Sequence, residues 1–282
     1  MAETRADSPV WLITGCSSGF GREFVRSALA HGFRVVATAR DPAKLHDLIA
    51  GHEDEAKAIA LDVTKRDQIK HAVGEAERAF GRIDVLVNNA GYGYLAAVEE
   101  GEDKDIRAIF ETNFFGAVAM IQAVLPGMRA RRHGHIVNIA SVGGVVGHAG
   151  SGFYAATKFA IEGLSESLAQ EVEPLGIRVL IVEPGPFRTN FGRLVKLSPN
   201  VIADYADSAG KHRRETIERS GKQSGDPARA AEAVIKALQS PEPPRHLVLG
   251  RAGFDNVENQ WRSLLHEADL WKATSLDADY PA

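Results

Sequence analysis

A glycine-rich turn near the amino terminus constrains the fold of this chain more than any other feature of its sequence. Residues 10–14 form a short apolar run typical of a buried strand, and residues 24–29 begin a helical pattern. Gly15, Gly19 and Gly21 lie between them, in the spacing G-x-x-x-G-x-G. Glycines let the backbone approach a phosphate closely, and a helix N-terminus attracts the anion. The turn predicts a dinucleotide-binding α/β fold, with a plain tight turn as the alternative.

Short apolar runs and helical patterns then alternate along the chain. We predict further strands over residues 34–39, 57–61, 85–87, 134–139, 178–182 and 246–249. This alternation predicts a single Rossmann-type α/β domain, doubly wound, with a mainly seven-stranded parallel sheet and helices on both faces.

The length of 282 residues suits one large core. We expect a disordered arm over residues 1–9, a cofactor-binding body over 10–250 with a substrate lid around 190–225, and a helical tail over 251–282. The tail carries an apolar stripe, which should pack on the body or on another subunit: Val257, Trp261, Leu264, Leu265, Ala268 and Trp271.

Composition narrows the class of protein. The net charge of −4 argues against a nucleic-acid partner. A single cysteine, Cys16, cannot form an intramolecular disulfide, residues 1–8 hold no apolar run, and we found no apolar stretch of membrane-spanning length. We therefore expect a cytoplasmic protein without membrane contact. The histidines show no ligand spacing, so no catalytic metal is predicted.

The end of the second predicted strand bears on which dinucleotide would bind. An acidic residue there holds a ribose 2′-hydroxyl, whereas an arginine accommodates a 2′-phosphate. The strand ends in Ala39 and Arg40, which favours NADP(H), although Asp41 could reach the ribose instead. After the third strand, Asp62 could accept a hydrogen bond from adenine or cap the next helix.

Tyr154 and Lys158 lie four residues apart, hence on one face of a predicted helix. A neighbouring ammonium should lower the pKa of the phenol and make Tyr154 a general acid/base; an ordinary surface pair is the alternative. Ser141 follows a predicted strand, at the edge where open α/β sheets bind ligands. Asn113 lies in an apolar helical section and needs a buried partner.

These motifs together resemble the short-chain dehydrogenase/reductase family, in its compact single-domain branch. The resemblance extends from Trp11 to about Leu249. It rests on the order of the glycine turn, Asn88-Asn89-Ala90-Gly91, Asn113, Ser141, Tyr154-x-x-x-Lys158 and Pro184-Gly185. The segments 89–93 and 183–189 are most similar to members acting on hydroxysteroids or retinol-like alcohols.

The resemblance implies a role for each catalytic residue. Tyr154 would exchange a proton with substrate, and Lys158 would lower its pKa and bind the nicotinamide ribose. Ser141 would orient the substrate oxygen, and Asn113 would hold a water that links Lys158 to solvent. Ala140 departs from the family, in which a second serine often occupies that position, yet Ser141 keeps its spacing to Tyr154.

The resemblance also implies the binding surfaces. The cofactor would contact Gly15, Ser17, Ser18, Gly19, Phe20, Gly21, Arg40, Asp62, Val63, Asn89, Ala90, Gly91, Tyr154, Lys158, Pro184, Gly185, Phe187 and Thr189. The substrate pocket should be apolar, lined beside Ser141 and Tyr154 by Tyr92, Val142, His148, Phe153, Phe187, Phe191 and Leu194.

The function expected from these residues is reversible hydride transfer between NADP(H) and the carbonyl or secondary alcohol of a hydrophobic, steroid- or retinoid-like substrate. The alternatives are an NAD-dependent alcohol dehydrogenase and a non-catalytic dinucleotide sensor. The family resemblance further implies a homodimer or homotetramer, assembled through the helices that bear Asn113 and Tyr154.

Overall fold

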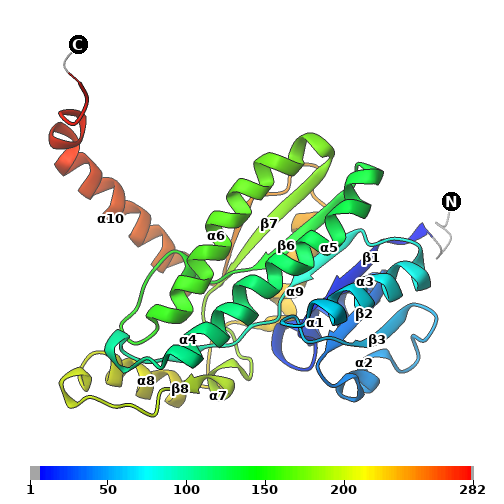
Figure 1. Cartoon of the computed structure of the whole chain (residues 1–282), viewed down its shortest axis with the longest axis horizontal. Coiled ribbons are helices and arrows are strands. Elements are labelled where there is room, and N and C mark those ends of the chain that lie inside the picture. Colours follow the sequence, from blue (N-terminus) through cyan, green and yellow to red (C-terminus); the bar gives the residue numbers. More distant parts are fainter. Residues whose placement is uncertain (1–6, 281–282) are drawn as a thin grey trace.

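A computed structural model describes residues 7–280 and contains the predicted seven-stranded parallel sheet (Figure 1). The strand order is β3-β2-β1-β4-β6-β7-β9. The strands are β1 (Val10–Ile13), β2 (Arg34–Ala39), β3 (Ala56–Ala60), β4 (Val85–Asn88), β6 (Gly134–Ile139), β7 (Ile177–Pro184) and β9 (His246–Leu249). Each lies within two residues of the range predicted from the sequence.

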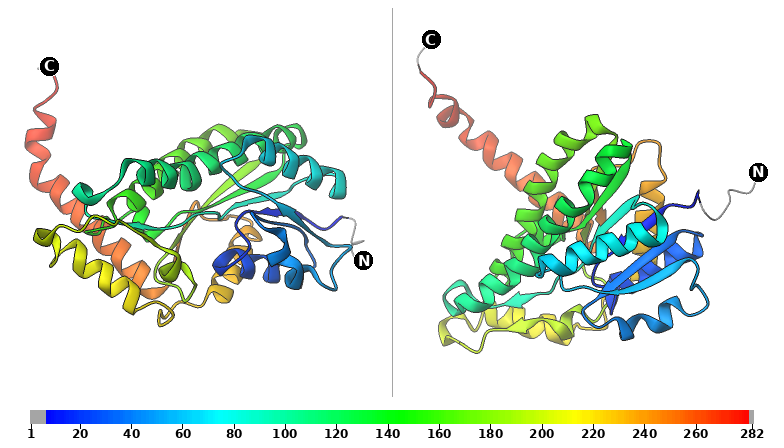
Figure 2. Two further views of the ribbon diagram at one scale, coloured as in Figure 1. Left: turned by 60° about the horizontal axis from the view of Figure 1, so that its bottom comes forward. Right: turned by 45° about the vertical axis from the view of Figure 1, so that its right-hand side comes forward.

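Helices cover both faces of the sheet, as the two views in Figure 2 show. One core cluster joins the sheet to α1 (Gly19–Ala30) and α9 (Pro227–Leu238). The other joins it to α3 (Arg66–Phe80), α5 (Gly116–Arg131) and α6 (Gly152–Val172). All four residues of β1 are buried, which explains its unbroken apolar sequence.

The remaining elements are shorter or lie outside these two layers. They are the helices α2 (His46–Ile49), α4 (Asp103–Phe110), α7 (Phe191–Leu194), α8 (Ala209–Glu218) and α10 (Arg251–Leu276), and the two-stranded sheet of β5 (Tyr94–Leu95) and β8 (Lys196–Leu197). This small sheet fastens the start of the predicted lid to the segment after β4.

Residues 103–131 do not form one continuous α-helix, and the interruption does not lie at Pro126. Pro126 lies inside α5, whereas residues Glu111–Phe115 form a π-helical turn between α4 and α5. The residue after this turn is Gly116, and Val63 packs directly against it. A Cβ at position 116 would lie 2.7 Å from the Val63 side chain, so there is no room for a larger residue. The stretch is long and apolar enough to cross a membrane, but α5 contributes Met120, Val124 and Met128 to the core of the fold.

The basic run 211–214 contributes to packing, because Arg213 forms a 2.6 Å ion pair with the buried Glu100. Of the predicted arm, residues 1–6 lie outside the described part of the chain. Ser8 and Pro9 are held, because their carbonyl oxygens accept hydrogen bonds from Arg34, so this end of the arm is ordered.

Candidate active site

The carboxyl ends of β1, β4 and β6 are tied together by side chains. Thr14 Oγ1 accepts hydrogen bonds from the backbone N–H of Asn89 (2.9 Å) and Ala90 (3.0 Å), and Asn89 Nδ2 donates to the Thr14 carbonyl (2.8 Å). Asn88 Nδ2 donates to Asn138 Oδ1 on β6 at 2.9 Å. The two adjacent amides therefore fix neighbouring strand ends, and the sheet edge is rigid.

The glycine turn beside this edge fits a dinucleotide phosphate. Gly15 and Gly19 have positive φ angles of 71° and 59°, which non-glycine residues rarely adopt. A Cβ on Gly21 would lie 2.4 Å from the Gly15 carbonyl oxygen. Ser18 caps α1 without a side-chain hydrogen bond, and the first turn of α1 holds no acidic residue. The helix N-terminus thus presents backbone N–H groups without a competing carboxylate.

The predicted neighbours of the glycine turn lie close to it. A Cβ on Gly19 would lie 3.4 Å from the Thr189 side chain, and the rings of Phe20 and Phe187 lie 5.2 Å apart. Phe187 is buried in the core cluster with Phe20 packed against it. Gly185 closes the end of β7, where a Cβ would lie 2.7 Å from Gly253 Cα at the start of α10.

Two acidic residues predicted near the adenine half make local hydrogen bonds. Asp41 Oδ1 accepts from the backbone N–H of Ala43 at 3.1 Å and caps a short 3₁₀ helix, while Arg40 is exposed directly after β2. Asp62 Oδ1 accepts from the backbone N–H and the hydroxyl of Thr64. It does not cap α3, which starts later, at Arg66.

Asn113 is buried in the π-helical turn, and both groups of its side-chain amide are used. Its Oδ1 accepts from the Tyr92 N–H at 3.0 Å, and its Nδ2 donates to the Tyr92 carbonyl (2.9 Å) and to Thr157 Oγ1 (3.1 Å). Asn113 therefore ties the segment after β4 to α6, and its predicted buried partners are found. The predicted link through water remains a prediction.

Ser141, Tyr154 and Lys158 come together at the ends of β6 and α6. The Ser141 hydroxyl is hydrogen-bonded to the Tyr154 side chain and accepts from the Gly143 N–H at 3.0 Å. Lys158 Nζ lies 5.8 Å from the centre of the Tyr154 ring and donates to the Ile139 carbonyl at 2.7 Å. The structure thus assembles the three groups that the sequence predicts.

The protonation of this group differs from the expectation. Burial raises the pKa of Tyr154, and only the hydrogen bond with Ser141 counteracts it. The predicted lowering by Lys158 is absent because desolvation dominates and the ammonium is directed to the Ile139 carbonyl. Burial also lowers the pKa of Lys158 to about 8, against the raising effect of Glu162.

Among the predicted substrate contacts, one aromatic residue packs on the Tyr154 ring and two others pack, like Tyr154, on the buried cluster of Tyr94, Ala96 and Ile109. Phe191, on α7, lies 5.5 Å from the Tyr154 ring, and Tyr92 and Phe153 pack on the same cluster of buried residues. His148 is exposed instead and stacks on His212 of α8, with ring centres 5.9 Å apart. Two others lie at the margin: Val142 near Gly253, and the exposed Leu194.

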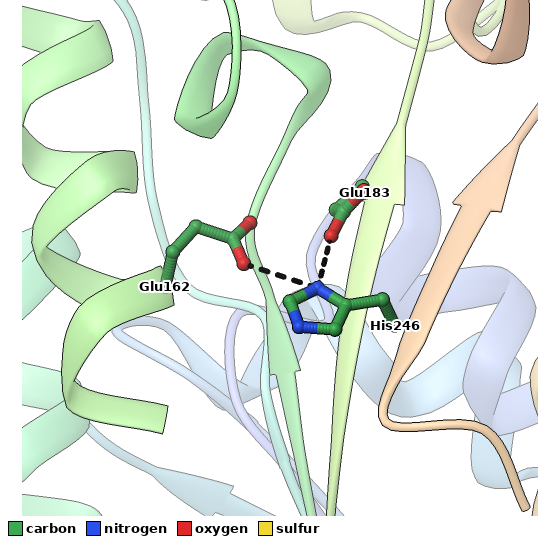
Figure 3. A group of neighbouring side chains, drawn as sticks. All are labelled: Glu162, Glu183 and His246. Carbon is green, nitrogen blue, oxygen red and sulfur yellow. Dashed lines mark hydrogen bonds and ion pairs between the residues drawn. The ribbon is translucent and has the colours of Figure 1, made fainter. Parts of the chain in front are cut away.

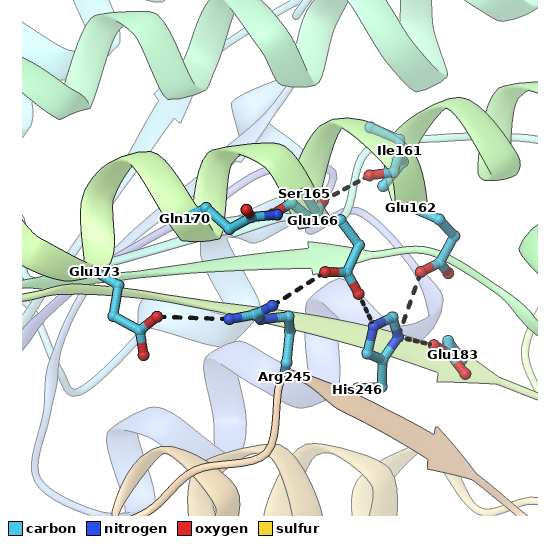
Figure 4. A network of polar contacts seen from close by, with 9 residues as sticks. All are labelled: Ile161, Glu162, Ser165, Glu166, Gln170, Glu173, Glu183, Arg245 and His246. Atoms are coloured by element: carbon cyan, nitrogen blue, oxygen red, sulfur yellow. Dashed lines mark hydrogen bonds and ion pairs between the residues drawn. The ribbon is translucent and has the colours of Figure 1, made fainter. Parts of the chain in front are cut away.

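A cluster of charged residues further along α6 from Lys158 is not among the site residues predicted from the sequence. His246 Nδ1 lies 2.6 Å from Glu183 Oε1 and 3.7 Å from Glu162 Oε2, and its Nε2 contacts Glu166 (Figure 3). Arg245 pairs with Glu166 at 3.1 Å and extends the network along α6 (Figure 4). Glu162 and Glu166 continue the helical face of Tyr154 and Lys158, and that spacing could have revealed them.

Two carboxylic acids and the histidine of this cluster all have raised pKa values. Burial and the neighbouring Glu183 raise the pKa of Glu162 to about 8, and burial also raises that of Glu183. Burial alone would lower the pKa of His246, but its contacts with Glu166 and Glu183 raise it overall. Donor atoms of Glu162, Glu183 and His246 lie within 4.8 Å of one another, yet His246 itself bridges the carboxylates.

The fold and the site together define a class of protein: an oxidoreductase that binds a nicotinamide dinucleotide at the carboxyl edge of a parallel sheet. Residues 9–198 match the family model described as short chain dehydrogenase. The chain therefore belongs to the short-chain dehydrogenase/reductase family.

Curated relatives include an oxidoreductase, BOA17, of Botryotinia fuckeliana, 36% identical over 268 residues, which are 95% of this chain and 98% of that protein. Retinol dehydrogenase 8 of Bos taurus is 37% identical over 258 residues, or 85% of this chain and 81% of that protein. A short-chain dehydrogenase from Streptomyces avermitilis has a solved structure with a TM-score of 0.91. It is 43% identical, with 96% of this chain and 100% of that chain covered.

Solved neighbours contain either form of the cofactor. Serine dehydrogenase in complex with NADP+ is 30% identical with a TM-score of 0.74, covering 85% of this chain and 94% of that one. A family member from Burkholderia phymatum in complex with NAD is 25% identical with a TM-score of 0.80, covering 96% of this chain and 97% of that one.

Proposed function

We propose that this protein is an NADP(H)-dependent oxidoreductase for the carbonyl or secondary alcohol of a hydrophobic substrate. The observation that carries the proposal is the contact of Ser141 with Tyr154 next to the buried Lys158. A phenol and a hydroxyl side by side can hold one substrate oxygen and exchange one proton with it. The glycine turn and the Thr189 side chain lie at the same edge of the sheet.

In the proposed reduction, the chain's own residues handle the oxygen and the proton. The cofactor, when bound, supplies the hydride. Ser141 and Tyr154 donate hydrogen bonds to the carbonyl oxygen, and Tyr154 transfers its proton as that oxygen becomes an alkoxide. The raised pKa of Tyr154 keeps the hydroxyl protonated until then. The charged Lys158 then stabilises the phenolate that forms.

The proposed preference for NADP(H) rests on the end of β2. Asp41 caps the following 3₁₀ helix, so its carboxylate is already engaged, and the exposed Arg40 follows β2, which pairs with the strand that leads into the glycine turn. A guanidinium suits a 2′-phosphate, which a carboxylate would repel. Turnover with NADPH and NADH in wild type and Arg40→Asp tests this. We expect NADPH to be preferred and the variant to lose that preference; a wild type that prefers NADH would contradict it.

The proposed hydrophobic substrate rests on the aromatic residues near Tyr154: Phe191 packs on its ring, and Tyr92 packs on the same buried cluster as Tyr154. Relatives named retinol dehydrogenase 8 and estradiol 17-beta-dehydrogenase 1 point in the same direction. A panel of ketones and alcohols, followed by NADPH absorbance, tests this. We expect turnover of bulky apolar substrates, and a protein that converts only small charged ones would contradict the proposal.

We also propose a homo-oligomer in the cytoplasm. Cys16 is a buried free thiol whose pKa burial raises to about 12, which suits a reducing compartment without requiring one. Sedimentation of the native protein with the membrane fraction of a cell lysate would contradict the location, and a monomeric mass at micromolar concentration would contradict the assembly.

A further inference from the structure

Helix α10 leaves the body of the protein and extends away from it. Figures 1 and 2 show it projecting beyond α6 in every view. Val257 is its last buried residue, and all described residues from Trp261 to Tyr280 are exposed. The arm, defined here as residues 261–276, therefore makes little contact with the rest of the described chain.

The arm is apolar for a segment in water. Its exposed side chains include Trp261, Leu264, Leu265, Leu270, Trp271 and Leu276. An isolated helix of fewer than about 15 residues is marginal in water, and most helices gain their stability by burying an apolar face. A helical arm of this length with so much exposed apolar surface is expected to be covered in the functional protein.

The spacing of the apolar residues identifies what covers them. Apolar side chains recur at alternating steps of three and four residues along the arm, at Trp261, Leu264, Ala268 and Trp271, in phase with Val257, which packs on the body at its base. This is the repeat of positions a and d in a helix-on-helix seam, with a period of about 3.5 residues. A membrane-surface helix is instead rich in Lys and Arg. Here Arg262 and Lys272 are outnumbered by acidic residues: Glu258, Glu267, Asp269 and Asp277.

We propose that the arm pairs with the arm of a second copy of this chain. The flanking charges are self-complementary. Lys272 occupies an e position, so in an antiparallel pair it faces Glu258 of the second copy and in a parallel pair Glu267. A pairing of like surfaces closes with two-fold symmetry. The seam is separate from the helices bearing Asn113 and Tyr154, and it does not depend on the proposed reaction.

Sedimentation equilibrium of the full chain tests this pairing. We expect the double variant Leu264→Glu/Trp271→Glu to have half the wild-type mass, whether dimer becomes monomer or tetramer becomes dimer. The matched control is Leu270→Glu/Leu276→Glu, which adds the same two charges to the same helix at exposed positions outside the seam. It should keep the wild-type mass. Circular dichroism and turnover of the double variant verify that its body remains folded.

Charge reversal then gives the orientation. Lys272→Glu should weaken the assembly, and a second change should restore it: Glu258→Lys for an antiparallel pair, Glu267→Lys for a parallel one. Equal masses for wild type and the double seam variant would overturn the proposal. So would loss of binding to phosphatidylcholine vesicles in that variant without any change in mass, because the arm would then be a membrane contact.

Discussion

Glu162 lies one helical turn beyond Lys158 on α6, and within the described residues neither of its carboxylate oxygens has a hydrogen-bond partner. The two groups interact electrostatically, and both have a pKa of about 8. Lys158, Glu166, Glu183 and His246 are the charged or titratable groups whose influence Glu162 feels. Lys158, which we propose to act in catalysis, is therefore coupled to a cluster that reaches the surface at His246.

The first prediction concerns the alkaline side of the pH profile. Glu162 raises the pKa of Lys158, so Glu162→Gln should lower it further. Because reduction requires charged Lys158, the rate falls as pH rises through this pKa. We expect the alkaline limb of kcat to move to lower pH by roughly half a unit to one unit. The exposed Glu171→Gln on the same helix should leave the limb in place. An unchanged limb in Glu162→Gln would separate the cluster from Lys158.

His246 should stabilise the fold by partnering the buried Glu183. Removing one partner of a buried pair costs about 3 kcal/mol, and less if the other partner can become neutral. The pKa of Glu183 is already raised by burial and rises further without His246. An acid with a raised folded pKa destabilises the protein as pH rises above its unfolded value of about 4.3. The raised pKa of His246 gives wild type an opposite pH dependence, so His246→Ala is compared with His246→Ala/Glu183→Gln, which differ only in Glu183. In thermal unfolding the single variant should be the less stable of the two by a wider margin at pH 8 than at pH 5; a wider margin at pH 5 would contradict this account.

Replacing glycine by alanine should weaken NADPH binding at one position and stabilise the fold at another. Gly21→Ala places a Cβ 2.4 Å from the Gly15 carbonyl oxygen, so it should distort the turn and weaken NADPH binding. Gly74 lies inside α3 with no atom within 4 Å of a Cβ. Gly74→Ala should stabilise the protein by about 0.5–1 kcal/mol in urea unfolding. Wild-type NADPH affinity in Gly21→Ala would refute the role given to the turn.

Asn113 should contribute to stability as well as to catalysis. Its replacement by alanine leaves the N–H and carbonyl of Tyr92 without their partner, which costs about 2 kcal/mol. We expect Asn113→Ala to unfold at lower urea concentration and to turn over slowly. Thr157→Val removes one hydrogen bond to the same side chain and the bond from Thr157 Oγ1 to the Tyr154 carbonyl, but it leaves no backbone N–H without a partner, so it should lose less stability. Equal losses would show that the link to Tyr92 contributes little.

The sheet could be predicted from the sequence because its central strands, such as β1 and β4, are buried on both faces and appear as short apolar runs. The proximity of the proposed catalytic residues could also be predicted, since Tyr154 and Lys158 lie on one helical face and Ser141 follows a strand. The π-helical turn could not be predicted, because it depends on how Asn113 reaches Tyr92 and Thr157 through space. His246 and Glu183 lie 63 residues apart, so no local pattern reveals their contact.

The direction of the pKa shift of Tyr154 could not be predicted from the sequence. Helical spacing correctly placed Lys158 beside the phenol, but the direction of the pKa depends on desolvation and on where the ammonium points. Burial raises the pKa of Tyr154, and Lys158 Nζ is bonded to Ile139. Sequence spacing therefore identified the acid/base pair without the balance of forces that sets its protonation.

The most direct test of the account is the turnover of Tyr154→Phe, which removes one hydroxyl and keeps the ring that packs on Phe191. We expect NADPH binding, measured by fluorescence titration, to stay within a few-fold of wild type. We expect kcat to fall by roughly 100-fold or more, the usual loss when a general acid is removed. Near-wild-type kcat in this variant would show that Tyr154 is not the proton donor.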